Sequence, residues 1–192
     1  MNYSPDPVRA EGPAAVTEGT PDGPTVLVLD PTGLAKHEGL PATWRDKTDE
    51  WQVVWCRLPA EGGLTQADDI LSDPPGETVH VVASGPFADG ALRLAEQHRD
   101  RVRSLLLVDP AADQFVPPGD GEAADRGWEA DNRERINDLA ESGVPVRVVA
   151  HSTGGADDRV PAPLPLGHPD VVAGVAQALA ELPANHEEGD RR

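Results

Sequence analysis

Five short apolar runs recur along the chain, separated by polar stretches with helical spacing. Each run is rich in Val and Leu and is nearly continuous, a pattern typical of strands that are covered on both faces. The runs are TVLVLD (25–30), QVVWCRL (52–58), TVHVVAS (78–84), RSLLLVD (103–109) and PVRVVAH (145–151). Together they predict a mostly parallel sheet of about five strands.

The stretches between these runs predict helices. Gly143 is expected to end one of them, because glycine readily takes the left-handed conformation that closes a helix. The predicted helices are 87–99, 128–142 and 170–182, with weaker and shorter candidates at 40–50 and 65–72. Alternating strands and helices predict an α/β three-layer sandwich with right-handed crossovers. In such a sheet ligands bind beyond the carboxyl ends of the strands, so the loops after residues 30, 58, 84, 109 and 151 are where we expect functional residues.

Three segments are polar, charged and rich in Pro, Gly or acidic residues: 1–23, 109–127 and 183–192. Such segments cannot bury enough apolar surface to offset the entropy cost of ordering. We therefore expect flexible tails at 1–23 and 183–192, a long acidic loop at 109–127, and one domain over 24–182.

The composition excludes several classes of function. A net charge of -18 argues against nucleic acid and anionic membrane surfaces as partners. The chain lacks a signal-peptide pattern and an apolar run long enough to span a bilayer. With Cys56 as the single cysteine, no internal disulfide and no Cys-based zinc site can form, which suggests a reducing, cytoplasmic setting. Cys56 itself is expected to be a buried hydrophobe.

No cofactor or metal site is predicted from the motifs. His37, His80 and His98 have no metal-ligand spacing. The first strand is not followed by G-x-G-x-x-G, and there is no phosphate-binding loop, so a dinucleotide or nucleoside triphosphate ligand is not expected.

Several stretches resemble the α/β-hydrolase superfamily. The best, TVHVVASGPFADGALRLAEQHRDRVRSLLLVDPA (78–111), is similar to the nucleophile strand, the helix behind it and the next strand. The others are PTVLVLDPTGLAKHEGLPATW (24–44), WQVVWCRLPAEGG (51–63), VPVRVVAHSTGGADDRVP (144–161) and LGHPDVVAGVAQALAEL (166–182). The resemblance implies a reduced α/β-hydrolase fold without the usual lid insertion.

The same resemblance shows a degenerate nucleophile elbow. The family places a serine on a strained turn between small neighbours, but that position falls on Gly85 here. Ser84 is adjacent, yet its neighbours two positions away are Val82 and Pro86, which do not suit a tight elbow. The other interpretation of Ser84 is that it ends the strand and hydrogen-bonds the turn.

The oxyanion loop is also altered, because Asp30 and Pro31 stand where the family has His-Gly. Proline has no backbone N–H, and Asp30 would place negative charge beside a developing oxyanion. Thr32 and Gly33 could still donate backbone N–H groups, and with Asp30 and Gly85 they would line a ligand site. Asp30 is interpreted either as a turn residue before proline or as an acid or base facing the crevice.

Two positions of the family's catalytic triad match this sequence better than the nucleophile position does. The resemblance places the general base at His168, and the carboxylate that orients it at Asp157 or Asp158. His168 is alternatively a helix N-terminal residue without a chemical role.

A second serine, in AHSTGG (150–155), has neighbours that match the elbow pattern better. Ser152 has Ala150 and Gly154 two positions away on either side, as an elbow requires. However, the residues that follow, ADDRVPAPLPLGHP (156–169), contain four prolines and no apolar period, so no helix can start there. We therefore interpret this stretch as a Gly-rich acid loop.

These features support one leading hypothesis and two alternatives. The leading hypothesis is a pseudoenzyme that has lost serine catalysis and acts by binding a small molecule or a protein. The first alternative is an active small hydrolase or acyl-transferase on esters or thioesters, with Ser84 or Ser152 as nucleophile, His168 as base and Asp157 or Asp158 orienting it. The second is a different α/β domain, such as a flavodoxin-like module, or a lyase or isomerase that needs no serine.

Overall fold

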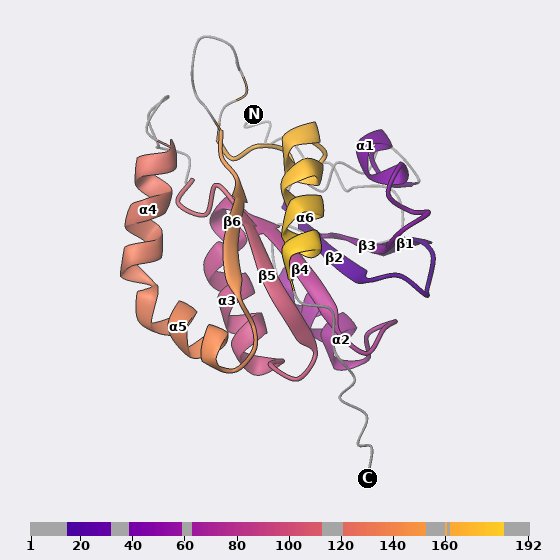
Figure 1. Ribbon diagram of the computed structural model, residues 1–192, viewed down its shortest axis with the longest axis horizontal. Coiled ribbons are helices and arrows are strands. Elements are labelled where there is room, and N and C mark those ends of the chain that lie inside the picture. Colours follow the sequence, from indigo (N-terminus) through magenta and orange to yellow (C-terminus); the bar gives the residue numbers. More distant parts are fainter. Residues whose placement is uncertain are drawn as a thin grey trace, which may run out of the picture.

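The computed structural model describes residues 15–31, 39–58, 63–112, 121–152, 160 and 162–182. Within these residues a single sheet has the strand order β1-β3-β2-β4-β5-β6 (Figure 1). All neighbouring strands are parallel except β1, which pairs antiparallel with β3. The strands are β1 (Ala15–Gly19), β2 (Thr25–Asp30), β3 (Gln52–Arg57), β4 (Val79–Ser84), β5 (Val102–Val108) and β6 (Val146–Ala150).

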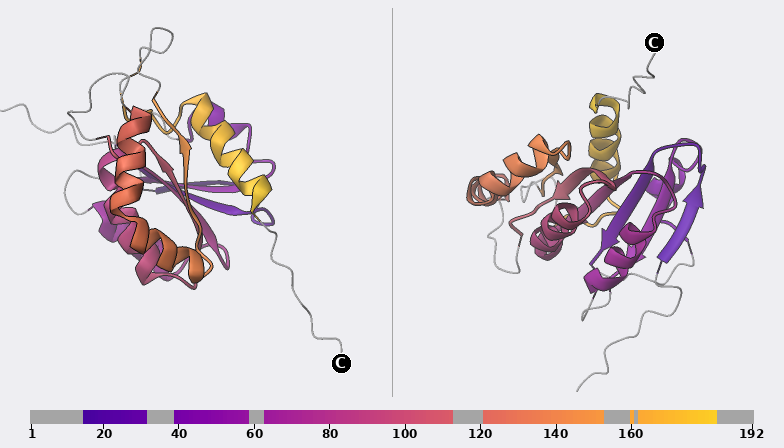
Figure 2. Two further views of the ribbon diagram at one scale, coloured as in Figure 1. Left: turned by 60° about the vertical axis from the view of Figure 1, so that its left-hand side comes forward. Right: turned by 90° about the horizontal axis from the view of Figure 1, so that it is seen from below.

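Helices connect the strands and cover both faces of the sheet. They are α1 (Ala42–Arg45), α2 (Gly63–Ser72), the 3-10 turn η1 (Gly85–Phe87), α3 (Ala88–Gln97), α4 (Gly121–Asp131), α5 (Arg133–Glu141) and α6 (Pro169–Glu181). Figure 2 shows α6 on the opposite side of the sheet from α2 and α3. No helix in the described part of the chain is both long enough and apolar enough to cross a membrane.

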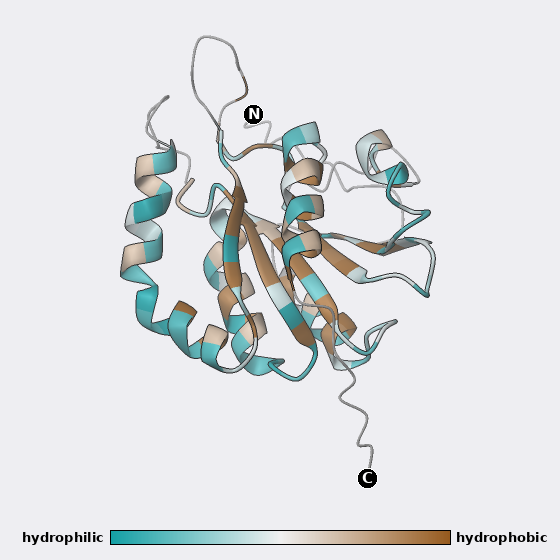
Figure 3. Ribbon diagram, viewed as in Figure 1, coloured by the Kyte–Doolittle hydropathy of each residue, from teal (hydrophilic) through white to brown (hydrophobic). Residues whose placement is uncertain are grey.

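The strands other than β1 contribute side chains to two cores, because successive side chains point to opposite faces of the sheet. In β2, Leu27 and Leu29 join the core under α2, α3 and α5, whereas Val26 and Val28 join the core under α1 and α6. β2 to β6 are correspondingly apolar over most of their length, with a few hydrophilic positions (Figure 3). The predicted α/β sandwich with a mostly parallel sheet is therefore confirmed.

Two segments differ from the sequence predictions. Residues 15–19, expected in the flexible tail 1–23, form β1, which is stabilised by pairing with β3 from Ala15–Cys56 to Gly19–Gln52. Helix α4 begins at Gly121, inside the segment expected to be the loop 109–127. Good helix formers such as Glu and Ala, together with the Glu122–Arg126 ion pair one turn apart, favour this helix although it has little apolar periodicity.

The helix predicted over 128–142 is divided between α4 and α5, with Asn132 between them. Its predicted end is confirmed. Gly143 has φ +89° and donates its N–H to the carbonyl of Ala140, which is the left-handed closure that glycine allows.

Candidate functional site

The turn after β4 has the geometry of an elbow, and the residue on it is glycine. Ser84 is extended, with φ -133° and ψ 155°, whereas Gly85 follows with φ +48°. A left-handed conformation directly after a buried strand is where an elbow places its nucleophile. Ser84 is only 1% exposed and makes no capping hydrogen bond from its side chain, so the expected bond to the turn is not formed.

The space beside Gly85 is already occupied. A Cβ on residue 85 would lie 3.0 Å from Cγ of Pro163 and 3.1 Å from the carbonyl oxygen of Ala112. One of these atoms belongs to the segment before α6 and the other to the loop after β5. A larger residue at position 85 would therefore meet strain in its backbone and crowding from two other segments.

Ser152 is placed beyond β6, as predicted, but its polar groups are used in structural bonds. Its hydroxyl donates to the carbonyl of Val160 at 2.8 Å, and its backbone N–H donates to Oδ1 of Asp109 at 2.7 Å. The first bond links Ser152 to Val160, and the second links the residue after β6 to the residue after β5. They give Ser152 a role in fixing backbone.

His168 caps helix α6. Its Nδ1 accepts the backbone N–H of Asp170 at 3.1 Å, and Pro169 occupies the first turn of the helix. Among the described residues, His168 has no hydrogen bond with Ser84 or Ser152. Asp157 and Asp158, proposed to orient this histidine, lie outside the described residues.

Asp30 is buried at the carboxyl end of β2. Its Oδ2 accepts the indole N–H of Trp55 at 3.1 Å, and its carbonyl accepts the N–H of Leu58. Thr32 and Gly33, the other predicted members of this loop, lie outside the described residues.

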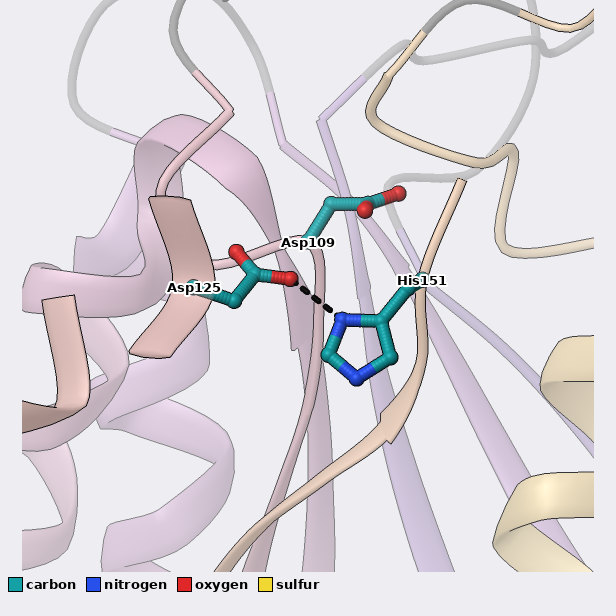
Figure 4. A group of neighbouring side chains, drawn as sticks. All are labelled: Asp109, Asp125 and His151. Carbon is teal, nitrogen blue, oxygen red and sulfur yellow. Dashed lines mark hydrogen bonds and ion pairs between the residues drawn. The ribbon is translucent and has the colours of Figure 1, made fainter. Parts of the chain in front are cut away.

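A different group of side chains meets beyond β5 and β6: Asp109, Asp125 and His151 (Figure 4). One oxygen of each carboxylate and one ring nitrogen of His151 all lie within 4.8 Å of one another. Asp109 directly follows β5, His151 directly follows β6, and Asp125 is on α4. The group therefore assembles from segments that are far apart in the sequence.

Asp109 is fixed by two backbone N–H groups. Oδ1 accepts from Ser152 at 2.7 Å and Oδ2 accepts from Leu164 at 2.8 Å. Burial raises the pKa of this carboxyl above its ordinary value, the neighbouring charge of Asp125 also raises it, and the two hydrogen bonds oppose the change. The residue also has φ +43°, an uncommon conformation for a non-glycine.

Asp125 orients His151. Its Oδ2 lies 2.6 Å from Nδ1 of the imidazole, and its Oδ1 accepts the N–H of Ala111 at 2.9 Å. The Asp125 side chain is 2% exposed and that of His151 is 36% exposed, so the carboxylate is enclosed while the ring reaches solvent. A buried carboxylate holding one ring nitrogen is an arrangement that serves either proton transfer or metal binding.

The sequence prediction missed this group as a unit. It placed Asp109 and His151 at the ends of two successive strands, and this was the one indication in the sequence that they could lie close together. Asp125 lies in the segment expected to be a loop, so nothing in the sequence brought its carboxylate to His151.

A scan of protein-family models finds no match for this chain, and a search of curated proteins finds none. Solved structures do match. A thioesterase domain from the curacin biosynthetic pathway is 18% identical over 53% of this chain and 43% of its own, with a TM-score of 0.36. A protein from Desulfitobacterium hafniense described as an α/β hydrolase family protein is 20% identical over 50% of this chain and 43% of its own, with a TM-score of 0.37.

An esterase from a marine microorganism is 12% identical over 67% of this chain and 60% of its own, with a TM-score of 0.39. This chain thus spans 43% to 60% of the length of these three structures.

Proposed function

We propose that this protein is a hydrolase-like α/β protein without serine-hydrolase catalysis, and that it acts by binding a small molecule or a protein. The observation that supports this most is the turn at Gly85, where the left-handed residue after β4 has no hydroxyl. The nearby contacts from Pro163 and Ala112 also leave little room for one.

The other candidate groups support the same proposal. An activated serine needs a base within hydrogen-bond reach, but Ser152 donates its hydroxyl to a backbone carbonyl and His168 accepts the N–H of Asp170. The Asp30-Pro31 sequence further lowers the number of backbone donors available for an oxyanion.

The carboxyl edge of the sheet is where we propose that a ligand binds. Parallel sheets take ligands at this edge, and here the strand ends carry buried polar residues instead of apolar ones. They are Asp30, Arg57, Ser84, Asp109 and Ser152. Asp30, Asp109 and Ser152 make hydrogen bonds within the chain, so a ligand at this edge would use their remaining lone pairs.

Ester hydrolysis tests the loss of serine catalysis. The full chain would be assayed with p-nitrophenyl acetate and an acyl thioester, in the presence of a chelator, beside the triple variant Ser84→Ala, Ser152→Ala, His168→Ala. We expect the two proteins to give equal rates. A wild-type rate more than about tenfold above that of the triple variant would mean that a serine is activated, and would overturn the proposal.

A further inference from the structure

We infer that Asp109, Asp125 and His151 form a binding site for one divalent transition-metal ion, of the zinc or manganese class. A metal site goes beyond the proposed function, and its existence does not depend on whether the protein has serine-hydrolase activity.

The donors already converge. One oxygen of each carboxylate and one nitrogen of the imidazole lie within 4.8 Å of one another, and they come from three separate elements (Figure 4). Ligand atoms about 2.0–2.2 Å from one ion lie roughly 3–3.6 Å apart. Binding an ion would therefore draw these atoms closer together by up to roughly 2 Å, a shift that the hydrogen bonds of both carboxylates would have to accommodate.

The charge of the group favours a cation. Asp109 and Asp125 are each 1% exposed, and carboxylates this buried are usually paired with a cation or bound to a metal. Within the described part of the chain, neither forms an ion pair with a lysine or arginine, and His151 is the one basic partner. Two carboxylates carry two negative charges, and one imidazole supplies at most one positive charge, whereas a divalent ion would balance both.

Both carboxylates are held in place by backbone. Asp109 accepts N–H groups from Ser152 and Leu164, and Asp125 accepts one from Ala111. Each carboxylate oxygen has two lone pairs, so these bonds leave capacity for an ion. Ligands oriented in this way bind with a smaller cost in side-chain entropy.

The donor set indicates the class of metal. Imidazole nitrogen suits zinc and related transition metals, whereas carboxylate oxygen also suits manganese. The hydrogen between Nδ1 of His151 and Asp125 has to leave before an ion enters. A neutral ring accommodates this by carrying its hydrogen on Nε2, and a charged ring releases one proton to solvent.

Calorimetric titration of the full chain with ZnCl₂ and MnCl₂ tests the inference. We expect one equivalent to bind to the wild type, and His151→Ala and Asp125→Asn to weaken binding by at least about tenfold. His168→Ala is the matched control, because that ring caps α6 and has no hydrogen bond to the group; its affinity should equal that of wild type. Wild-type binding no tighter than about 1 mM, or an equal loss in His168→Ala, would overturn the inference.

Paramagnetic broadening by Mn²⁺ separates this site from general attraction of cations to a chain of net charge -18. In proton NMR, the imidazole signal that disappears in His151→Gln should broaden first, at substoichiometric Mn²⁺. Uniform broadening of all six histidines would contradict a defined site. Neither readout involves a serine, so a failure here leaves the test of serine catalysis unaffected.

Discussion

Cγ of Pro163 lies 3.0 Å from the position that a Cβ on Gly85 would occupy. The segment before α6 is therefore packed against the left-handed turn that follows β4. Asp109 holds that segment in place by accepting the N–H of Leu164, the residue after Pro163. A glycine at position 85 and the position of this segment are thus mutually compatible.

A side chain at position 85 is expected to destabilise the protein. Gly85→Ala requires a left-handed alanine and displaces Pro163 or Ala112, so we expect a loss of about 1–3 kcal/mol in the free energy of unfolding. Urea unfolding measures it. The matched control is Gly127→Ala in α4, where a Cβ meets nothing within 4 Å and should instead stabilise the helix by up to about 1 kcal/mol. Equal stability of Gly85→Ala and wild type would contradict this prediction.

Stability should depend on pH through His80. Burial lowers the pKa of its imidazole to about 4, with Arg103 adding to the effect, and its Nδ1 contacts Oγ of Ser104 at 2.7 Å. The unfolded chain binds a proton near pH 6.5 while the folded chain does not, so stability is lost as pH falls from about 6.5 to 4.

We expect this contribution to reach roughly 3 kcal/mol at the acid end. Unfolding by urea at several pH values measures the slope, and His80→Asn should remove this part of it. A variant whose pH dependence matches that of wild type would show that His80 is not responsible.

The single thiol should be unreactive in the folded protein. Cys56 is fully buried in β3, and burial, with a further effect of Asp30, raises its pKa to about 11. The thiolate is the reactive form, so modification by DTNB at pH 8 should be at least roughly a hundredfold slower than in denaturant. Rapid modification of the native protein would mean that β3 opens readily or that the thiol is accessible.

One ion pair should contribute measurable stability. Arg135 on α5 contacts both oxygens of Glu96 on α3, at 2.7 and 2.9 Å, which lowers the pKa of Glu96 and raises that of Arg135. A double-mutant cycle with alanine should give a coupling of about 0.5–1 kcal/mol. The more exposed pair Arg126–Glu122 is the comparison and should give about 0.5 kcal/mol or less. A larger coupling in the exposed pair would contradict this account.

The sheet was predictable because its strands are buried on both faces. A run such as TVLVLD has no helical period and no polar face, and β2 begins and ends at the predicted residues. β1 was not predictable in this way. Ala15–Gly19 is short and half-polar, and it is ordered by hydrogen bonds to β3 that no local pattern reveals.

The site was predictable only in part. The turn at Gly85 could be predicted because it lies directly between a strand and a helix that are both recognisable in the local sequence. One of the two interpretations of His168, a residue at a helix N-terminus, agrees with the structure, although the sequence alone could not show that Nδ1 accepts the N–H of Asp170. The contact between Asp125 and His151 depends on how α4 packs beyond β6. The acidic composition of 109–127 predicted a loop there, so neither the helix nor the contact was expected.

Labelling with a fluorophosphonate tests the central claim most directly. The folded full chain would be exposed to the probe beside a known serine hydrolase, and the intact mass measured. We predict no adduct on this protein under conditions that label the reference enzyme completely. An adduct mapped to Ser84 or Ser152 that disappears in His168→Ala would contradict the account and would show that this protein has an activated serine.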